Sequence, residues 1–310
     1  MIGLARLLSI FLFALLCWGP ARASTLVLVY SERSAGYLDI AKVVTSELEK
    51  TGLPAQEVSE FTGSEWLSAQ SGGVSSKLIV TLGADAFRQV LALEPKVPVL
   101  AALLPRGSYA RILRESGRKQ SPGTTALYLD QPFNRRLDLL KLVLPDAKRV
   151  GVLLGPESQA LQSSLAQAAL NRNLGIESSQ VNNPAGLFSG LKTVLDGTDV
   201  LLAVADPQVY SSATIANILM ATYRAGIPMI AFSPAYVKAG AMLAIYASPV
   251  QIGVQTANMA RQILKTNTLP EPQNPAEFEI SVNDHVARSL GLNLDAKSLT
   301  EKLHNLARRP

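Results

Sequence analysis

The sequence predicts an α/β protein of two lobes, each a doubly wound parallel sheet, with a cleft between them. Short apolar runs rich in Val, Ile and Leu alternate with runs whose apolar residues recur every three or four positions. This alternation is typical of parallel strands covered by helices on both faces. It extends through 310 residues, which suffices for two domains of about 100–150 residues. Near the middle, an amphipathic run ends at Leu144-Pro145 and the apolar run 150–154 starts a second unit.

Strands are predicted where apolar residues fill both faces of a short run. These runs are residues 26–30, 78–82, 97–101, 125–129, 150–154, 200–204, 228–232 and 242–246. Because both faces are apolar, each strand is expected to lie inside a sheet rather than on a solvated surface.

Helices are predicted between these strands from the three-and-four spacing of apolar residues. Their ranges are 38–50, 84–93, 135–144, 159–173, 186–195, 211–225 and 252–264. Thr51-Gly52, Asn173-Leu174-Gly175 and Ala225-Gly226 are typical helix ends. Trp66 is expected to be a packing residue on a short helix, and the Pro-rich run 268–276 is expected to be an ordered linker.

Residues 1–23 predict a cleaved signal peptide and hence a periplasmic protein. Arg6 precedes an apolar run over 7–18, and Ala21-Arg22-Ala23 offers the small residues of a cleavage site after Ala23. A membrane anchor is a rival interpretation, but the apolar run is short of the roughly 20 residues that span a bilayer. A lipoprotein is disfavoured because Leu16 precedes Cys17, where a lipobox has Gly or Ala.

Composition argues against several classes of function. The formal net charge is +5, of which Arg6 and Arg22 belong to the leader, and no Lys/Arg run occurs, so no nucleic-acid partner is expected. Cys17 is the only cysteine and the two histidines, His285 and His304, lie near the C-terminus. Catalytic triads and thiolate or histidine metal sites are therefore not expected. We expect no catalytic residue, no metal and no cofactor.

Candidate ligand-binding residues follow the strands, because ligands of open α/β sheets lie beyond the carboxyl ends of strands. The candidates are Ser31, Arg33, Gly83, Ala84, Asp85, Tyr128, Glu157, Ser158, Asp206, Phe232, Ser233 and Tyr246. Among them Asp206 is the strongest, since an acid at a strand end can pair with a ligand ammonium group. It also fits a helix N-cap before Pro207.

For the other candidates, too, both a ligand-binding role and a purely structural role fit the sequence. The rings of Tyr128, Phe232 and Tyr246 could stack on an apolar or aromatic ligand. Arg33 could hold a carboxylate in a bidentate pair, although it also fits a plain surface position. Ser158 and Ser233 fit helix caps, and Gly83 fits a tight turn between a strand and a helix.

Several stretches resemble the ABC-transporter substrate-binding proteins of the tryptophan and tyrosine type. The first-domain loop is TLGADAF, and the entry to the second domain is LVLPDAKRVGVLLGPES. The strand–Asp–helix block is DVLLAVADPQVYSSATIANILMATYRAGIPMIAF. Two later stretches, VKAGAMLAIYASPVQIGVQTANMARQIL and ISVNDHVARSLGLNL, complete the resemblance. Their order and spacing cover nearly the whole mature chain.

Two stretches depart from the family pattern at the expected cleft. The family usually has an Asp-Pro pair where residues 102–107 read ALLPRG. It usually has an acid near the strand end where residues 246–249 read YASP. These departures bear on which ligand the cleft takes and on whether a permease is served.

The resemblance implies the type I periplasmic-binding-protein fold and its use. The expected lobes are 24–124 plus 247–274 and 125–246 plus 275–310, with crossovers near 122–131, 246–249 and 272–277. A monomer would capture a small, partly apolar, amino-acid-like ligand by hinge closure and deliver it to an ABC permease.

Two other classes of protein remain open at this stage. One is an envelope interaction or sensor protein that uses the same fold with a modified cleft, which the departure at 102–107 favours. The other is an enzyme, for instance a hydrolase of the Ser/Lys or carboxylate type. No G-x-S-x-G elbow or S-x-x-K follows a strand, which argues against this class.

Overall fold

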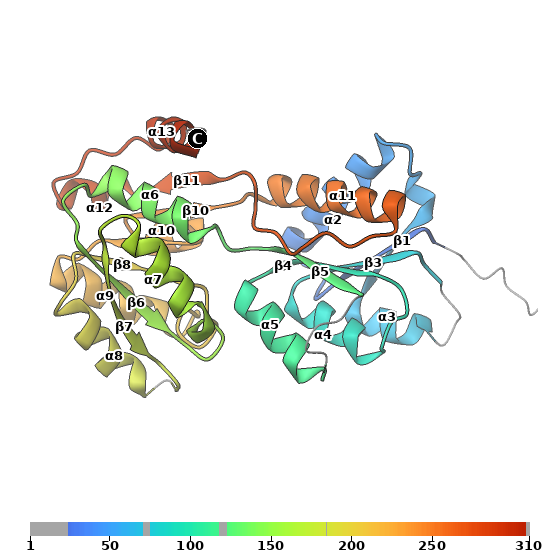
Figure 1. Ribbon diagram of the computed structural model, residues 1–310, viewed down its shortest axis with the longest axis horizontal. Helices are drawn as coiled ribbons and strands as arrows, with labels where there is room; N and C mark the ends of the chain where they lie inside the picture. The colour runs from blue at the N-terminus through green and yellow to red at the C-terminus, as the bar shows by residue number, and fades with distance from the viewer. Residues whose placement is uncertain (1–23, 71–74, 118–122, 184, 308–310) are drawn as a thin grey trace, which may run out of the picture.

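The computed structural model describes residues 24–70, 75–117, 123–183 and 185–307. The predicted signal peptide and its cleavage site before Ser24 lie outside these residues. Figure 1 shows two α/β lobes side by side, joined by extended segments of chain. We define the first lobe as the five-stranded sheet with its helices, and the second lobe as the six-stranded sheet with its helices.

The first lobe contains a parallel sheet in the order β2-β1-β3-β4-β5. Its strands are β1 (Leu26–Tyr30), β2 (Val58–Thr62), β3 (Leu78–Leu82), β4 (Val99–Leu104) and β5 (Thr124–Tyr128). Every residue of β1 and β3 is buried. These apolar runs form the centre of the sheet because both of their faces are covered by helices.

Two layers of helices cover the first sheet (Figure 1). One layer is α2 (Ala35–Glu49) and α11 (Pro249–Thr266); the other is α3 (Gly63–Gln70), α4 (Ala84–Ala92) and α5 (Arg106–Glu115). A short 3-10 helix, η1 (Ala55–Glu57), leads into β2. A Cβ at Gly253 of α11 would lie 2.6 Å from Val43 Cγ1, so glycine lets α11 pack closely on α2.

The second lobe contains a sheet in the order β11-β10-β9-β8-β6-β7. Its strands are β6 (Arg149–Leu154), β7 (Gly175–Gln180), β8 (Val200–Leu202), β9 (Met229–Ala231), β10 (Leu243–Tyr246) and β11 (Glu279–Val282). All neighbours are parallel except β10 and β11, which are antiparallel.

Helices on both faces also bury the second sheet. One cluster of buried side chains joins the sheet to α6 (Phe133–Val143), α7 (Gln162–Leu170), α12 (Asp284–Ser289) and α13 (Ala296–Ala307). Another joins it to α8 (Gly186–Leu195), α9 (Ile215–Ala225) and α10 (Pro234–Ala239). The 3-10 helix η2 (Gln159–Leu161) runs directly into α7. This doubly covered arrangement confirms the predicted fold class.

The chain passes between the lobes three times (Figure 1). It crosses from β5 to α6, from β10 to α11, and from α11 back to β11. The sequence placed residues 125–129 in the second lobe, but β5 pairs with β4 in the first sheet. On its other side, Tyr128 N donates to Gln273 O at 2.8 Å and Gln273 N donates to Ala126 O at 2.8 Å. The first crossing therefore begins after β5.

All eight predicted strands and all seven predicted helical runs are present, with shifted ends. The run 159–173 is divided into η2 and α7, and Trp66 is buried on α3, as expected. Among the described residues, the elements that the sequence did not predict are β2, β7, β11, α5, α10, α12, α13 and the 3-10 helix η1. The three missed strands occupy sheet edges, where half-exposed polar residues replace the apolar runs used as the signal.

Candidate functional site

The helix α5, which follows β4, touches the loop that follows β6 across the junction of the lobes. Glu157, after β6, lies against the start of α5: a Cβ built on Gly107 would be 2.4 Å from Glu157 O. The Ser108 hydroxyl donates to the Glu157 carboxylate, and Arg111 Nε donates to Glu157 Oε1 at 2.6 Å. Arg111 also pairs with Glu115 on its own helix. Glu157, a predicted ligand residue, therefore joins the two lobes.

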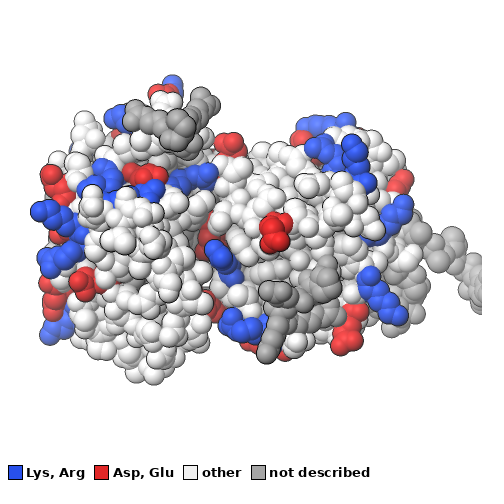
Figure 2. All heavy atoms as spheres, in the orientation of Figure 1, with Lys and Arg blue, Asp and Glu red and all other residues white. Residues whose placement is uncertain are grey.

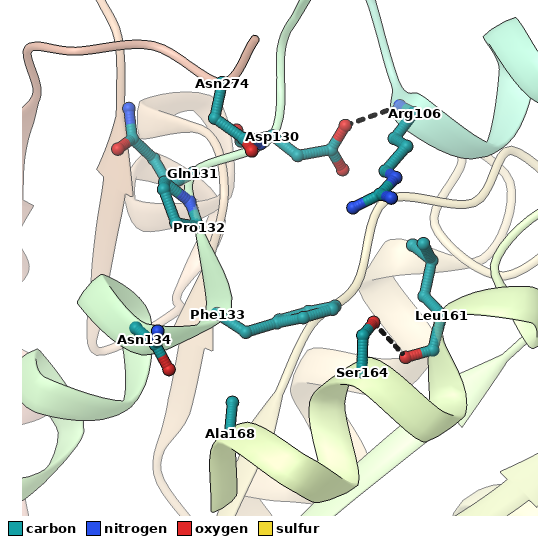
Figure 3. Close-up of a pocket in the computed structure, with 10 residues that line it drawn as sticks. All are labelled: Arg106, Asp130, Gln131, Pro132, Phe133, Asn134, Leu161, Ser164, Ala168 and Asn274. Carbon is teal, nitrogen blue, oxygen red and sulfur yellow. Dashed lines mark hydrogen bonds between the residues drawn. The ribbon is translucent and has the colours of Figure 1, made fainter. Parts of the chain in front are cut away.

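A cavity of about 210 Å³ lies at this junction and is built from both lobes. On the face shown in Figure 2 the molecule is notched between the lobes, with acidic and basic side chains beside the notch. Figure 3 shows the residues that line the cavity: Arg106, Asp130, Gln131, Pro132, Phe133, Asn134, Leu161, Ser164, Ala168 and Asn274. They come from α5, the first crossing, the start of α6, η2, α7 and the third crossing.

Arg106, the first residue of α5, supplies a cation to this cavity. Its backbone N donates to Asp130 Oδ2 at 2.6 Å, which fixes the start of the helix against the first crossing. Its guanidinium points into the space between Asp130 and Phe133 (Figure 3), with Cζ 5.7 Å from the centroid of the Tyr128 ring. Within the described part of the chain, that guanidinium has no hydrogen-bond or ion-pair partner.

Asp130 lies in the first crossing and lines the same cavity. Burial raises the pKa of its carboxyl, against the opposing effects of the Arg106 backbone N–H and of Arg136. Asn274 of the third crossing donates from Nδ2 to the backbone oxygen of Asp130 at 2.8 Å. Two of the three crossings are thus held together at one wall of the cavity.

The opposite wall is largely apolar. Phe133 extends across the cavity toward Ser164 and Leu161, with Ala168 below it (Figure 3). Ser164 Oγ donates to Leu161 O at 2.9 Å, so its proton is used within η2 and α7. The cavity therefore offers a cation and a carboxyl on one side and hydrocarbon on the other, which can hold a small amphipathic molecule.

Asp206, the strongest sequence candidate, is occupied by protein donors. Its Oδ2 accepts from Glu157 N at 3.0 Å and from Ser158 N and Oγ at 2.9 Å, and its Oδ1 accepts from Gln208 N at 3.0 Å. A Cβ at Gly155 would lie 2.4 Å from Asp206 Oδ1. The carboxylate, 2% exposed, joins the turn after β6 to the turn after β8. Ligand contact by Asp206 or Ser158 stays a prediction.

Arg136 and Tyr210 are buried donors that the sequence did not indicate. Arg136, on α6, donates from Nη2 to Ala203 O, but its Nε has no partner among the described residues. The Tyr210 hydroxyl is likewise without one. Burial lowers the pKa of Arg136 to about 10 and raises the pKa of Tyr210. Such orphaned groups are uncommon in protein interiors, and neither carries a pattern visible in sequence.

The predicted ligand residues of the first lobe that follow β1 and β3 do not line the cavity. Ser31 Oγ accepts from Ala86 N at 3.1 Å. Gly83 has φ +95°, and a Cβ there would lie 2.5 Å from Ser31 Oγ, so this turn requires glycine. Ala84 begins α4, and Asp85 pairs with Arg88 on the surface. Arg33 pairs with Glu65 at 2.9 Å.

The remaining candidates are used in packing and capping. Phe232 meets Tyr210 and Tyr236 edge-on, and Ser233 Oγ accepts from Ala235 N at the start of α10. The Tyr246 hydroxyl donates to Glu279 Oε2 at 3.3 Å. Tyr128 lies beside Arg106 and edge-on to Tyr109, and burial raises its pKa to about 12. Ligand contact by these four residues remains untested.

The family model described as ABC transporter substrate binding protein matches residues 78–303. The chain belongs to this family. The matched range includes the cavity, the Asp206 turn and parts of both lobes. The family is the one that the sequence resemblance indicated. No curated protein matches this substrate-binding chain. Within the residues that the structure describes, no helix combines the length and the apolar character needed to cross a membrane.

Solved structures of low sequence identity share the fold of this family member. A conserved domain protein from Vibrio cholerae is 18% identical, with a TM-score of 0.63 over 89% of this chain and 97% of that one. The ABC domain from Streptococcus pneumoniae in complex with L-Trp is 16% identical, with a TM-score of 0.62 over 89% and 98%. The open, ligand-free substrate binding protein with adhesive properties from Clostridium difficile is 16% identical, with a TM-score of 0.66 over 88% and 97%.

Proposed function

We propose that this protein is the periplasmic solute-binding component of an ABC transport system. It captures a small ligand between its lobes and presents it to a permease in the inner membrane. The observation that carries the proposal is the cavity at the junction, whose walls come from both lobes and from two crossings. Family membership supports the same role, and the apolar leader with its small-residue cleavage site supports export.

The ligand is small, partly apolar and amino-acid-like in this proposal. The volume of about 210 Å³ is below that of drug-sized pockets. Arg106 can bind a carboxylate, Asp130 can accept from an ammonium group, and Phe133 and Leu161 can cover a hydrocarbon side chain. The structural neighbour in complex with L-Trp agrees with such a ligand.

Capture proceeds by hinge closure in this proposal. Three crossings connect the lobes, and the contacts of Glu157 with Ser108 and Arg111 are made only when the lobes approach each other. Closure would remove water from the cavity and strengthen its polar contacts. A permease could then distinguish the closed form by touching both lobes at once.

Native mass spectrometry of the protein purified from a periplasmic extract tests this function. A retained small molecule, or binding of a member of a metabolite library by calorimetry, is the expected result. Small-angle scattering should then show a smaller radius of gyration with solute than without it. An empty protein that responds to no library member would contradict the proposal.

A second candidate is an envelope interaction or sensor protein with the same fold. The saturated Asp206 turn and the ion pair of Glu157 with Arg111 favour it, because both occupy polar groups that a solute could use. Such a protein would hold its lobes together without solute. Scattering curves that are unchanged by every solute, together with a protein partner captured at native expression level, would favour this candidate.

A further inference from the structure

We infer that Arg135 clamps the first and third crossings together, so that both crossings turn with the second lobe when the lobes move. This inference deepens the proposed function, on whose hinge closure it rests, and gives a positioning role to a residue outside the cavity lining. The third crossing ends in the run 274–278, which leads into β11 and belongs to no strand. Even so, each of the five carbonyl oxygens in this run accepts a hydrogen bond from a side chain.

One set of donors to this run comes from α11 in the first lobe. Gln255 Nε2 donates to Asn274 O at 3.2 Å, and Gln255 Oε1 accepts from Ala276 N at 2.9 Å. Gln251 Nε2 donates to Phe278 O at 3.4 Å. All three bonds join neutral amides, which contribute less to stability than bonds from charged donors.

The other set of donors comes from Arg135, on the first turn of α6 in the second lobe, and from Gln131 just before that helix. Arg135 Nη1 and Nη2 donate to Pro275 O and Ala276 O, each at 2.9 Å. Nη1 also donates to Gln131 Oε1 at 2.6 Å, and Gln131 Nε2 donates to Glu277 O at 3.2 Å. Arg135 therefore binds the first and the third crossing at once, and these bonds form the clamp.

The clamp is stronger than the bonds to α11. Its donor is a guanidinium that forms no ion pair with any described carboxylate, so the two crossings are its partners. The ring of Phe278, a buried residue, lies 4.9 Å from Arg135 Cζ and also stacks on His304 of α13, with ring centroids 4.4 Å apart. When the lobes move, the amide bonds to α11 should therefore open first, and the third crossing should stay with α6.

The clamp leaves a single residue in each of these two crossings at which the chain can turn. In the first crossing it is Asp130, which follows the last backbone bond to β4 and precedes Gln131. In the third crossing it is Asn274, which follows the bridge from Gln273 to β5. Asn274 Nδ2 donates to Asp130 O at 2.8 Å, and both residues line the cavity. A solute in the cavity would therefore touch the two turning points themselves.

Distances between spin labels on the two lobes test this inference on the full mature chain without solute. Cys17 is the only cysteine and precedes the expected cleavage site, so two introduced cysteines can be labelled selectively. Arg114→Cys on α5 and Lys192→Cys on α8 are exposed positions, one in each lobe. Double electron–electron resonance then gives the distribution of distances between the lobes. Adding Arg135→Met should broaden this distribution, because the two crossings would turn independently.

Three further variants sharpen the comparison. Gln255→Met removes bonds from the α11 side of the third crossing and should leave the width of the distribution unchanged. Arg172→Met removes an arginine that binds Asp138 and Asn134 within the second lobe and should also leave it unchanged. Arg135→Lys keeps the charge but not the paired donors, so its width should be intermediate. The melting temperature of each variant shows whether it folds.

A distribution as narrow in Arg135→Met as in the wild type would overturn the clamp. A larger broadening in Gln255→Met than in Arg135→Met would also overturn it, because the third crossing would then move with the first lobe. If Arg135→Met does not fold, Arg135→Lys decides by the same criteria. None of these results depends on a solute. Failure of the whole metabolite library would therefore overturn the proposed function and leave the clamp to be judged by the distances alone.

Discussion

Two carboxylates stand at the junction of the lobes, and the chain uses them in different ways. Asp206 accepts four hydrogen bonds from residues of its own lobe and is almost wholly buried. Asp130, in the first crossing, accepts from the backbone of Arg106 in the first lobe and lines the cavity. The difference teaches that an acid at a strand end is available to a solute only where the surrounding turns leave it unsaturated.

The largest expected effect comes from removing the saturated carboxylate. Asp206→Ala would leave the backbone donors of Glu157, Ser158 and Gln208 without their acceptor. We expect the free energy of unfolding to fall by about 3 kcal/mol, as for loss of a buried charged hydrogen-bond network. Urea unfolding measures it, with the exposed Asp196→Ala as control. If Asp206→Ala were as stable as wild type but no longer bound solute, Asp206 would be a ligand residue rather than a structural one.

Gly107→Ala tests whether the lobes must approach each other. The added Cβ would meet Glu157 O at 2.4 Å, across the junction, so the lobes would have to separate. Solute affinity should fall about tenfold, equivalent to about 1.4 kcal/mol, and the radius of gyration in scattering should increase. Gly36→Ala, near the start of α2, meets nothing within 4 Å and should behave as wild type. Unchanged affinity in Gly107→Ala would mean that binding does not need this contact.

Glu157→Gln removes the charge that connects the lobes. The carboxylate is 9% exposed and its partner Arg111 28% exposed, so the pair is partly shielded from salt. We expect closure to weaken by about 1 kcal/mol and solute affinity to fall about fivefold. Glu115→Gln alters the same Arg111 within one helix and should leave affinity unchanged. Equal effects of the two variants in calorimetry would show that the contact between lobes has no special role.

The smallest expected effect on the free energy of unfolding comes from replacing Asp199, an exposed carboxylate that binds backbone N–H groups as Asp206 does. Its Oδ2 accepts from Lys148 N and Arg149 N, each at 2.8 Å, and these bonds lower its pKa. A lowered folded-state pKa stabilises the protein above the ordinary Asp pKa of about 3.9, and the stabilisation is lost as pH falls through the folded value. Because Asp199 is exposed, Asp199→Ala should cost only about 0.5 kcal/mol at pH 7.

The pH dependence of unfolding checks this last prediction. The difference in free energy of unfolding between wild type and Asp199→Ala should be constant near neutral pH. It should become smaller below about pH 4. A difference that persists unchanged at pH 2 would show that the two backbone bonds do not depend on the charge. Asp196→Ala again serves as the surface control.

The central strands could be predicted because burial on both faces leaves a continuous apolar run. Such runs form β1, β3 and β6. The edge strands β2 and β7 carry polar, half-exposed residues, so neither an apolar run nor a clear alternation indicates them. The helix α5 buries Tyr109 and Ile112, but these two residues form too short an apolar stripe among Arg, Gly and Ser to predict a helix.

None of the twelve residues that the sequence predicts to bind ligand lines the cavity, although Tyr128 and Glu157 contact residues of α5 beside it. Sequence places Asp206 and Glu157 after strands, yet it does not show that the Glu157 and Ser158 backbone groups saturate Asp206. Those bonds join residues about fifty positions apart. Arg106 stood out in sequence only as a departure from the family pattern. Its access to the cavity depends on β5 and the first crossing lying beside it.

The three crossings also determine when each lobe can be completed during synthesis. The core of the first lobe contains Ile252, Met259 and Ile263 of α11, although its sheet ends with β5 at Tyr128. The second lobe in turn needs Leu299 and Leu303 of α13. In many proteins an N-terminal domain folds while the rest of the chain is being made. The first lobe of this chain cannot be completed in that way. Both lobes become complete only with the last quarter of the sequence, so an exported chain would reach its folded form after translocation rather than lobe by lobe.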